Sequence, residues 1–166
     1  WEFYKDTRVL YGSVIVDGKT YKHPKPTSMR WRPDKIICEY EIADAKVTEE
    51  KFISASDAIA SIITSSKPVT LQFSGHSFYT RNSTSSSAAI KHDERNRALI
   101  ISEGGTMKAR PDPNGPKRIG PSVYNDMSTV ISSSRSFTKT LVTKKDEKGI
   151  QHYSFSIPCD KKGIVV

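Results

Sequence analysis

The feature that most constrains the fold is an alternating stretch broken by one turn dipeptide near the amino terminus. RVLYGSVIV at 8–16 is rich in β-branched and aromatic residues, and KTYKH follows at 19–23. Between them lies Asp17-Gly18, a dipeptide favoured in two-residue turns that need positive φ. The pattern predicts a β-hairpin at this place in the chain.

Further strands are expected downstream. SMRWR at 28–32 places Met29 and Trp31 on one face and Arg30 and Arg32 on the other. Because alternation pairs Trp31 with Met29, we expect Trp31 in the core. Strands are also expected at 35–42, 69–75, 78–81, 88–92, 97–102, 106–110 and 149–158, and the serine-rich run at 82–87 is expected to be a flexible loop.

Two segments predict helices. Ser54 is followed three residues later by Asp57, the spacing of a capping box, and isoleucines then recur at helical intervals until Lys67-Pro68. Gly120-Pro121-Ser122 opens a longer segment in which apolar residues recur by threes and fours as far as Leu141. The basic end of this second segment, with Lys139, Lys144 and Lys145, suits the negative end of a helix dipole.

The chain order is therefore several strands, a helix, several strands and a second helix, a duplicated architecture without repeated letters. The 166 residues suit one domain that buries a core without disulfides. We expect a single domain over 1–166, with its core at about 8–143 and a C-terminal extension at 144–166.

Composition points to a polyanionic partner. There are 26 Lys and Arg against 18 Asp and Glu, a net charge of +8 and a pI near 9.5. Such a surplus attracts nucleic acid or, less readily, an acidic membrane surface. The two cysteines, Cys38 and Cys159, are expected to be free thiols, and because the chain begins at Trp1 without a Met we expect an upstream segment to have been removed.

The basic residues gather in two segments. Residues 17–35 carry a local charge of +4 and residues 104–118 a local charge of +3. Since these segments hold equivalent positions in the two halves, they predict two basic ribbons on one surface, which would grip phosphates without reading bases. The predicted nucleic-acid contacts, one of them a tyrosine able to stack on a base, are Lys22, Lys25, Arg30, Arg32, Lys35, Tyr79, Arg81, Lys91, Arg95, Arg97, Lys108, Arg110, Lys117 and Arg118.

The order of these parts resembles the Whirly fold, shared by plant single-stranded DNA-binding proteins and the guide-RNA-binding proteins of trypanosome mitochondria. Three runs carry the resemblance: LYGSVIV, SMRWRPDKIICEYEI and KFISASDAIASII fall in the family's order, and IGPSVYNDMSTVISSSRSF stands where the family has its closing helix. The likeness covers roughly residues 8–142. The lysines of the plant KGKAAL motif are absent from LYGSVIV, in which Gly12 alone stays in register, and this favours the trypanosome branch.

The resemblance implies an α+β fold, in which two four-stranded antiparallel sheets pack together with a helix after each half (β4-α-β4-α). It also implies a homo- or heterotetramer with a related subunit, located in the mitochondrial matrix (the kinetoplast). Guide RNA would lie on a basic sheet surface with its bases presented for annealing to messenger RNA during RNA editing. Single-stranded DNA binding of the plant type stays open as the alternative, and the sequence does not separate RNA from DNA.

Catalysis is not expected. Ser83-Thr84-Ser85 with Glu103 imitates part of an ADP-ribosyltransferase signature, but position 101 is Ile where that family usually has a second acidic or amide residue. A ribonuclease would need two histidines, or a histidine and an acid, around a phosphate, and no spacing joins any two of the four histidines. No metal site or cofactor is expected, because the cysteines lack neighbours at ligand spacing. A role in protein interaction alone is the non-catalytic runner-up.

Overall fold

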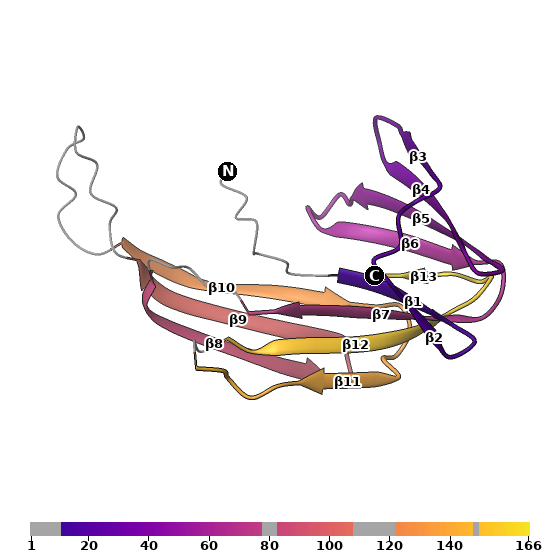
Figure 1. Cartoon of the computed structure of the whole chain (residues 1–166). Coiled ribbons are helices and arrows are strands. Elements are labelled where there is room, and N and C mark those ends of the chain that lie inside the picture. Colours follow the sequence, from indigo (N-terminus) through magenta and orange to yellow (C-terminus); the bar gives the residue numbers. More distant parts are fainter. Residues whose placement is uncertain (1–10, 78–82, 108–121, 148–149) are drawn as a thin grey trace.

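The protein consists of β-strands in the part of the chain that the structure describes. The computed structural model describes residues 11–77, 83–107, 122–147 and 150–166 (Figure 1). No helix occurs in these ranges, so the expected α+β class with a helix after each half is wrong. The strands are β1 Tyr11–Val16, β2 Lys19–Lys22, β3 Ser28–Trp31, β4 Ile36–Ile42, β5 Ala45–Ile53, β6 Ile59–Ser65, β7 Val69–His76, β8 Ser83–Asp93, β9 Ala98–Met107, β10 Ser122–Ser132, β11 Lys139–Val142, β12 His152–Cys159 and β13 Ile164–Val165.

The segment expected as the first helix is a tight turn followed by strand β6. The Ala58 backbone N–H donates to the Ser54 hydroxyl at 3.2 Å, and Asp57 has a φ of 58°. β6 then pairs with β5 from Ile53↔Ile59 to Val47↔Ser65. Ser and Asp side chains bind nearby backbone groups in turns as well as at helix starts, and for this reason the capping spacing was misleading.

The segment expected as the second helix forms β10 and β11. β10 pairs with β9 as far as Ser132↔Ala98, and β11 pairs with β12. Ser, Thr and β-branched residues, which are frequent in this segment, are weak helix formers, and Thr, Val and Ile are also good strand formers. The same composition places the expected loop at 82–87 in β8 from Ser83 onward. The strand expected at 78–81 lies outside the described residues, as does most of the one at 106–110.

The strands form three antiparallel sheets. Sheet A has the order β11-β12-β7-β1-β2, sheet B the order β13-β6-β5-β4-β3, and sheet C the order β10-β9-β8. The predicted hairpin of β1 and β2 is confirmed, and both turn residues, Asp17 and Gly18, have positive φ, at 48° and 78°. In Figure 1 the strands of sheet C run alongside β7 and β12, whereas β3 to β6 fan away at one end.

One hydrophobic cluster joins the three sheets. The inner face of sheet A supplies alternate residues of β12, among them Phe155 and Ile157, which are 1% and 0% exposed. Sheet C contributes Leu99 and sheet B contributes Ile63 to the same cluster. Sheet A is therefore one layer of a sandwich, and the described strands of sheets B and C pack against its inner face.

Trp31 does not lie in this core. Its side chain is 75% exposed and that of Met29 is 62% exposed, so the expected burial of Trp31 is wrong. Alternation correctly placed the two residues on one face of β3, because they pair with Ile36 and Cys38 of β4. β3 is the edge strand of sheet B, however, and the hydrophobic core does not reach this edge, although Met29 and Trp31 lie on the core-facing side of the sheet.

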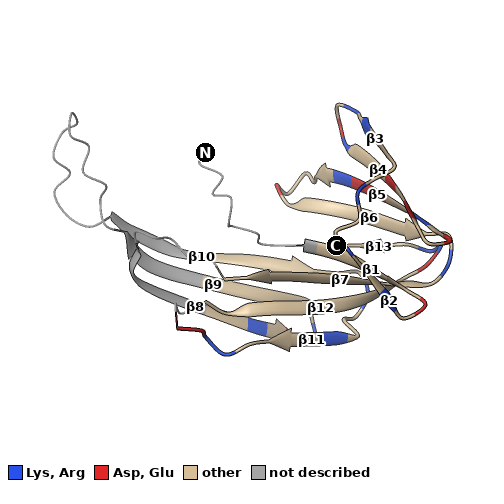
Figure 2. Ribbon diagram, viewed as in Figure 1, with Lys and Arg blue, Asp and Glu red and all other residues tan. Residues whose placement is uncertain are grey.

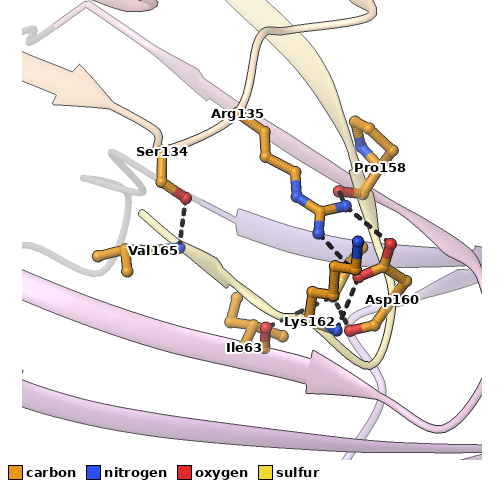
Figure 3. Close-up of polar contacts among 8 residues, drawn as sticks. Ile63, Ser134, Arg135, Pro158, Asp160, Lys162 and Val165 are labelled. Carbon is orange, nitrogen blue, oxygen red and sulfur yellow. Dashed lines mark hydrogen bonds and ion pairs between the residues drawn. The ribbon is translucent and has the colours of Figure 1, made fainter.

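A C-terminal segment ties the sheets together. Arg135, which follows β10, binds Asp160, which follows β12, through two N–H···O bonds of 2.7 and 3.2 Å (Figure 3). Ser134 also bonds to Val165 of β13 in sheet B. Both cysteines are buried and free, as expected, and burial raises the pKa of Cys159 to about 11.

Candidate nucleic-acid interface

Three of the predicted phosphate contacts are paired with acids of the protein itself. Arg30 lies 3.7 Å from Glu39, Arg32 lies 3.4 Å from Asp34, and Lys35 lies 2.6 Å from Glu50. The first two pairs are exposed and weak, whereas the Lys35 pair is partly buried. The β3 edge is thus less positive than its own segment of sequence suggests, because β4 and β5 bring carboxylates beside it (Figure 2).

The other predicted cations within the described residues are spread over several elements. Lys91 lies on β8 and faces outward from sheet C, because its neighbours Ile90 and His92 face the core side. Arg95 lies in the exposed turn after β8, and Arg97 donates to the Ser134 carbonyl at 2.8 Å. These three residues do not share a sheet with Lys22 and Lys25.

The expected second ribbon is not tested by the structure. Its basic residues lie outside the described ranges: Lys108, Arg110, Lys117 and Arg118. Two further predicted contacts, Tyr79 and Arg81, also lie outside them. Of the first ribbon, Lys22 and Lys25 are exposed and form no ion pair with any described residue. Lys22 ends β2 at one edge of sheet A.

The outer face of sheet A is mostly polar. Because Tyr153, Phe155 and Ile157 point into the core, the intervening residues of β12 point outward. The strand register carries this face across the sheet to the following residues: Ser13, Ile15, Thr20, Lys22, Thr70, Gln72, Ser74, His76, Lys139, Leu141, His152, Ser154, Ser156 and Pro158. Ser156 is the only buried member of this set.

One row of directly opposed residues crosses all five strands of this face. The register runs from Lys139 on β11 through three central strands to Lys22 on β2, in the order Lys139↔Ser156↔Gln72↔Ser13↔Lys22. Neighbouring strands lie about 4.8 Å apart, so the two lysines lie at the ends of a row about 19 Å long. None of the five side chains has a hydrogen-bond or ion-pair partner among the described residues.

The strands of sheet A contain no Asp or Glu, and the carboxylate that the structure places beside the outer face is that of Asp146, in the loop before β12, 4.0 Å from His152 Nε2. The three central strands, β1, β7 and β12, contain no Asp, Glu, Lys or Arg at all. Figure 2 shows β7 and β12 uncoloured by charge, whereas β5 carries both signs. An anion on this face therefore meets cations at both edges and neutral donors between them.

Two histidines also meet on this face. His76 ends β7 directly opposite His152 at the start of β12, and their ring centroids lie 5.8 Å apart. His76 Nδ1 lies 2.8 Å from the Ser77 carbonyl oxygen, and His152 Nε2 lies 4.0 Å from an Asp146 carboxylate oxygen. They are 76 residues apart in sequence, so no local motif could have joined them.

Sequence reasoning missed Lys139 as part of a binding surface because it placed this residue at the end of a helix. The sequence carries no alternation that could have found it, because the order in KTLV is polar, polar, apolar, apolar, whereas the strand exposes Lys139 and Leu141 and half-buries Thr140 and Val142. Four residues are a short run, and the preceding serines gave no turn signal strong enough to end the helical pattern.

Within the described ranges, no group of three or more His, Cys, Asp or Glu side chains is placed to hold a metal ion. The described residues also include no helix of the length and apolarity that crossing a bilayer requires. No protein-family model matches the sequence, and no curated protein matches it either.

Proposed function

We propose that the protein binds single-stranded RNA along the phosphate backbone, across the outer face of sheet A. The observation that carries this proposal is the row from Lys139 to Lys22 across five strands that contain no Asp or Glu. Lysines at the two ends would neutralise phosphates, and the half-buried Ser13 and Gln72 side chains between them offer a hydroxyl and an amide donor. Binding of this kind is nearly independent of base sequence.

The shape of the surface favours a single strand. A duplex groove is read by an element that enters it, such as a helix or a two-stranded ribbon, and an open sheet face presents neither. A single strand can follow a flat surface and bring successive phosphates to both edges of the sheet. RNA is proposed ahead of DNA because the serine and glutamine side chains of the row can bond to ribose 2′-hydroxyl groups.

Other parts of the expected function depended on the family resemblance. Annealing of guide RNA, a mitochondrial location and a tetramer with a related subunit stay predictions. The described residues form no helix, whereas the Whirly fold has one after each half. The proposal therefore keeps the phosphate-gripping sheet and drops the Whirly architecture.

Charge reversal at the two ends of the row tests the proposal. The double variant K22E/K139E should bind a labelled single-stranded RNA at least about 25-fold more weakly at 0.1 M salt, since each phosphate contact to a single strand contributes about 0.7 to the salt slope. The control K46E/K91E makes the same change in net charge on sheets B and C. Fluorescence anisotropy over a salt series measures both the affinity and the slope.

The slope for K22E/K139E should be about 1.4 smaller than that of the parent. Equal losses in the two double variants would show that binding follows net charge rather than this face, and would contradict the proposal. Equal affinity for single-stranded RNA and for duplex would contradict the single-strand preference. A protein that retains no RNA at low salt has no such function.

A further inference from the structure

His76 and His152 form a pair of imidazoles on the face proposed to hold RNA. Four residues of β12 separate His152 from Ser156 in the lysine row, a distance of about 13 Å along the strand. The two rings meet edge to face at 64°, so a phosphate would lie above the pair and not between the rings. An RNA strand that crosses the lysine row can therefore reach the two histidines within a few nucleotides.

The two rings have different surroundings. A carbonyl oxygen only accepts hydrogen bonds, so the contact of His76 Nδ1 with Ser77 requires the proton on Nδ1. In the neutral ring this leaves the lone pair on Nε2, as a general base requires. His152 is exposed and its Nε2 lies 4.0 Å from an Asp146 carboxylate oxygen, and this ring is assigned the role of general acid.

The loop at 143–147 contacts His152, the proposed general acid, and positions it. The His152 backbone N–H donates to the Thr143 hydroxyl at 2.9 Å, and Asp146 accepts the Ile150 N–H at 2.9 Å. Lys144 and Lys145 are exposed in the same loop. They add positive charge to the loop that contacts His152, and such charge stabilises a phosphate that becomes more negative during a reaction.

We propose that His76 and His152 cleave single-stranded RNA by acid–base catalysis, an activity that rests on the proposed RNA binding. His76 Nε2 takes the proton of a ribose 2′-hydroxyl, and the 2′-oxygen forms a bond to the adjacent phosphorus. The bond from phosphorus to the 5′-oxygen breaks, and protonated His152 gives its proton to that leaving oxygen. The products are a 2′,3′-cyclic phosphate and a 5′-hydroxyl end, and no metal or other reactant takes part.

The experiment separates binding from cleavage. The parent protein is incubated in EDTA with labelled single-stranded RNA, with the same sequence as DNA, and with the same RNA methylated on every 2′-oxygen. RNA should be cut to a cyclic-phosphate product, whereas DNA and methylated RNA should stay intact because neither has a free 2′-hydroxyl. Anisotropy with the methylated RNA tests the proposed function on its own.

Two variants assign the residues. His76→Asn, which keeps a donor for the Ser77 carbonyl, and His152→Asn should each lower the cleavage rate about 10²- to 10⁴-fold, the usual size of a general acid or base contribution. His23→Asn is the control, because it removes an exposed imidazole from a residue with a φ of 46°, which Asn tolerates. Thermal unfolding checks that each variant is folded, and His76→Gln and His152→Gln replace a variant that is not.

Each outcome decides the inference. Binding of methylated RNA without cleavage of RNA overturns the activity and leaves the proposed function standing. Absence of both overturns both. Cleavage that EDTA abolishes, that also cuts DNA, or that persists in both histidine variants overturns the two-histidine mechanism.

Discussion

The aromatic packing around Phe155 gives a prediction whose size follows from ring distances. Phe155 is 1% exposed and lies between Phe73, at 5.3 Å, and Phe137, at 4.5 Å between centroids. Tyr153 is a third ring partner, at 6.4 Å. An aromatic pair contributes about 0.5 to 1.5 kcal/mol beyond its buried area, so the loss of the three pairs in Phe155→Leu should cost about 1.5 to 4.5 kcal/mol. Phe155→Ala, which also leaves a cavity, should cost about 3 to 5 kcal/mol.

Phe52→Leu is the matched control. Phe52 is half-buried on sheet B and makes no ring contact with the described residues, so the same substitution there should cost under about 1.5 kcal/mol. Equilibrium unfolding in urea, monitored by circular dichroism, gives the free energies. Equal losses in the two leucine variants would refute the role given to the stacked rings.

A double-mutant cycle sharpens this test. Combining Phe155→Leu with Phe137→Leu should show a coupling of about 0.5 to 1.5 kcal/mol, because the first substitution already removes the ring pair that the second would break. Strict additivity of the two losses would mean that the pair contributes only its buried area.

Three further predictions concern single sites. Trp31→Ala should change the free energy of unfolding by less than about 1 kcal/mol, because the side chain is 75% exposed. Ile157→Ala, at a residue that is 0% exposed, should lower it by about 2 to 5 kcal/mol in the same urea assay. A large loss for Trp31→Ala would mean that Trp31 is a core residue. Ala43 is the first residue of the two-residue turn between β4 and β5, and its φ of 53° is unfavourable for a residue with a Cβ. Ala43→Gly should therefore raise the free energy of unfolding by about 0.5 to 1 kcal/mol, whereas the control Ala89→Gly, in strand β8, should lower it. An increase in both variants, or in neither, would argue against backbone strain at Ala43. The hydrogen bond from Arg135 holds the pKa of Asp160 below its usual value, so the ionised carboxylate stabilises the fold at pH values above about 3.9. The difference in melting temperature between the parent and Asp160→Asn should therefore shrink as the pH falls below that value. A difference that stays constant down to pH 3 would contradict the ion pair.

The strands were predictable where alternation agreed with a turn dipeptide. Alternating apolar and polar residues fit only a strand in the hairpin of β1 and β2 and in strands β4, β7 and β12. The helix predictions were wrong because isoleucines at 59, 62 and 63 fit a helix as well as a strand, and the pairing of β6 with β5 and β13 decides between them. Such pairing is a property of distant segments and is not visible in a window of a dozen residues.

The candidate site was predictable only in part. Lys22 was expected to bind phosphate, and it lies at one end of the lysine row. Its counterpart Lys139 and the meeting of His76 with His152 depend on β12 lying between β11 and β7, an arrangement that joins segments far apart in the chain. The pairing of Arg30, Arg32 and Lys35 with acids likewise depends on which strands neighbour β3.

The central position of β12 in sheet A has a consequence for synthesis of the chain. β7 obtains its first neighbour, β1, as soon as residue 76 has been made, but its other edge waits for residues 152–159. At 5 to 20 residues per second this wait lasts roughly 4 to 17 seconds. During that time the nascent protein presents an unpaired strand edge next to Val69, Leu71 and Phe73, which a chaperone or a neighbouring chain can reach before β12 does.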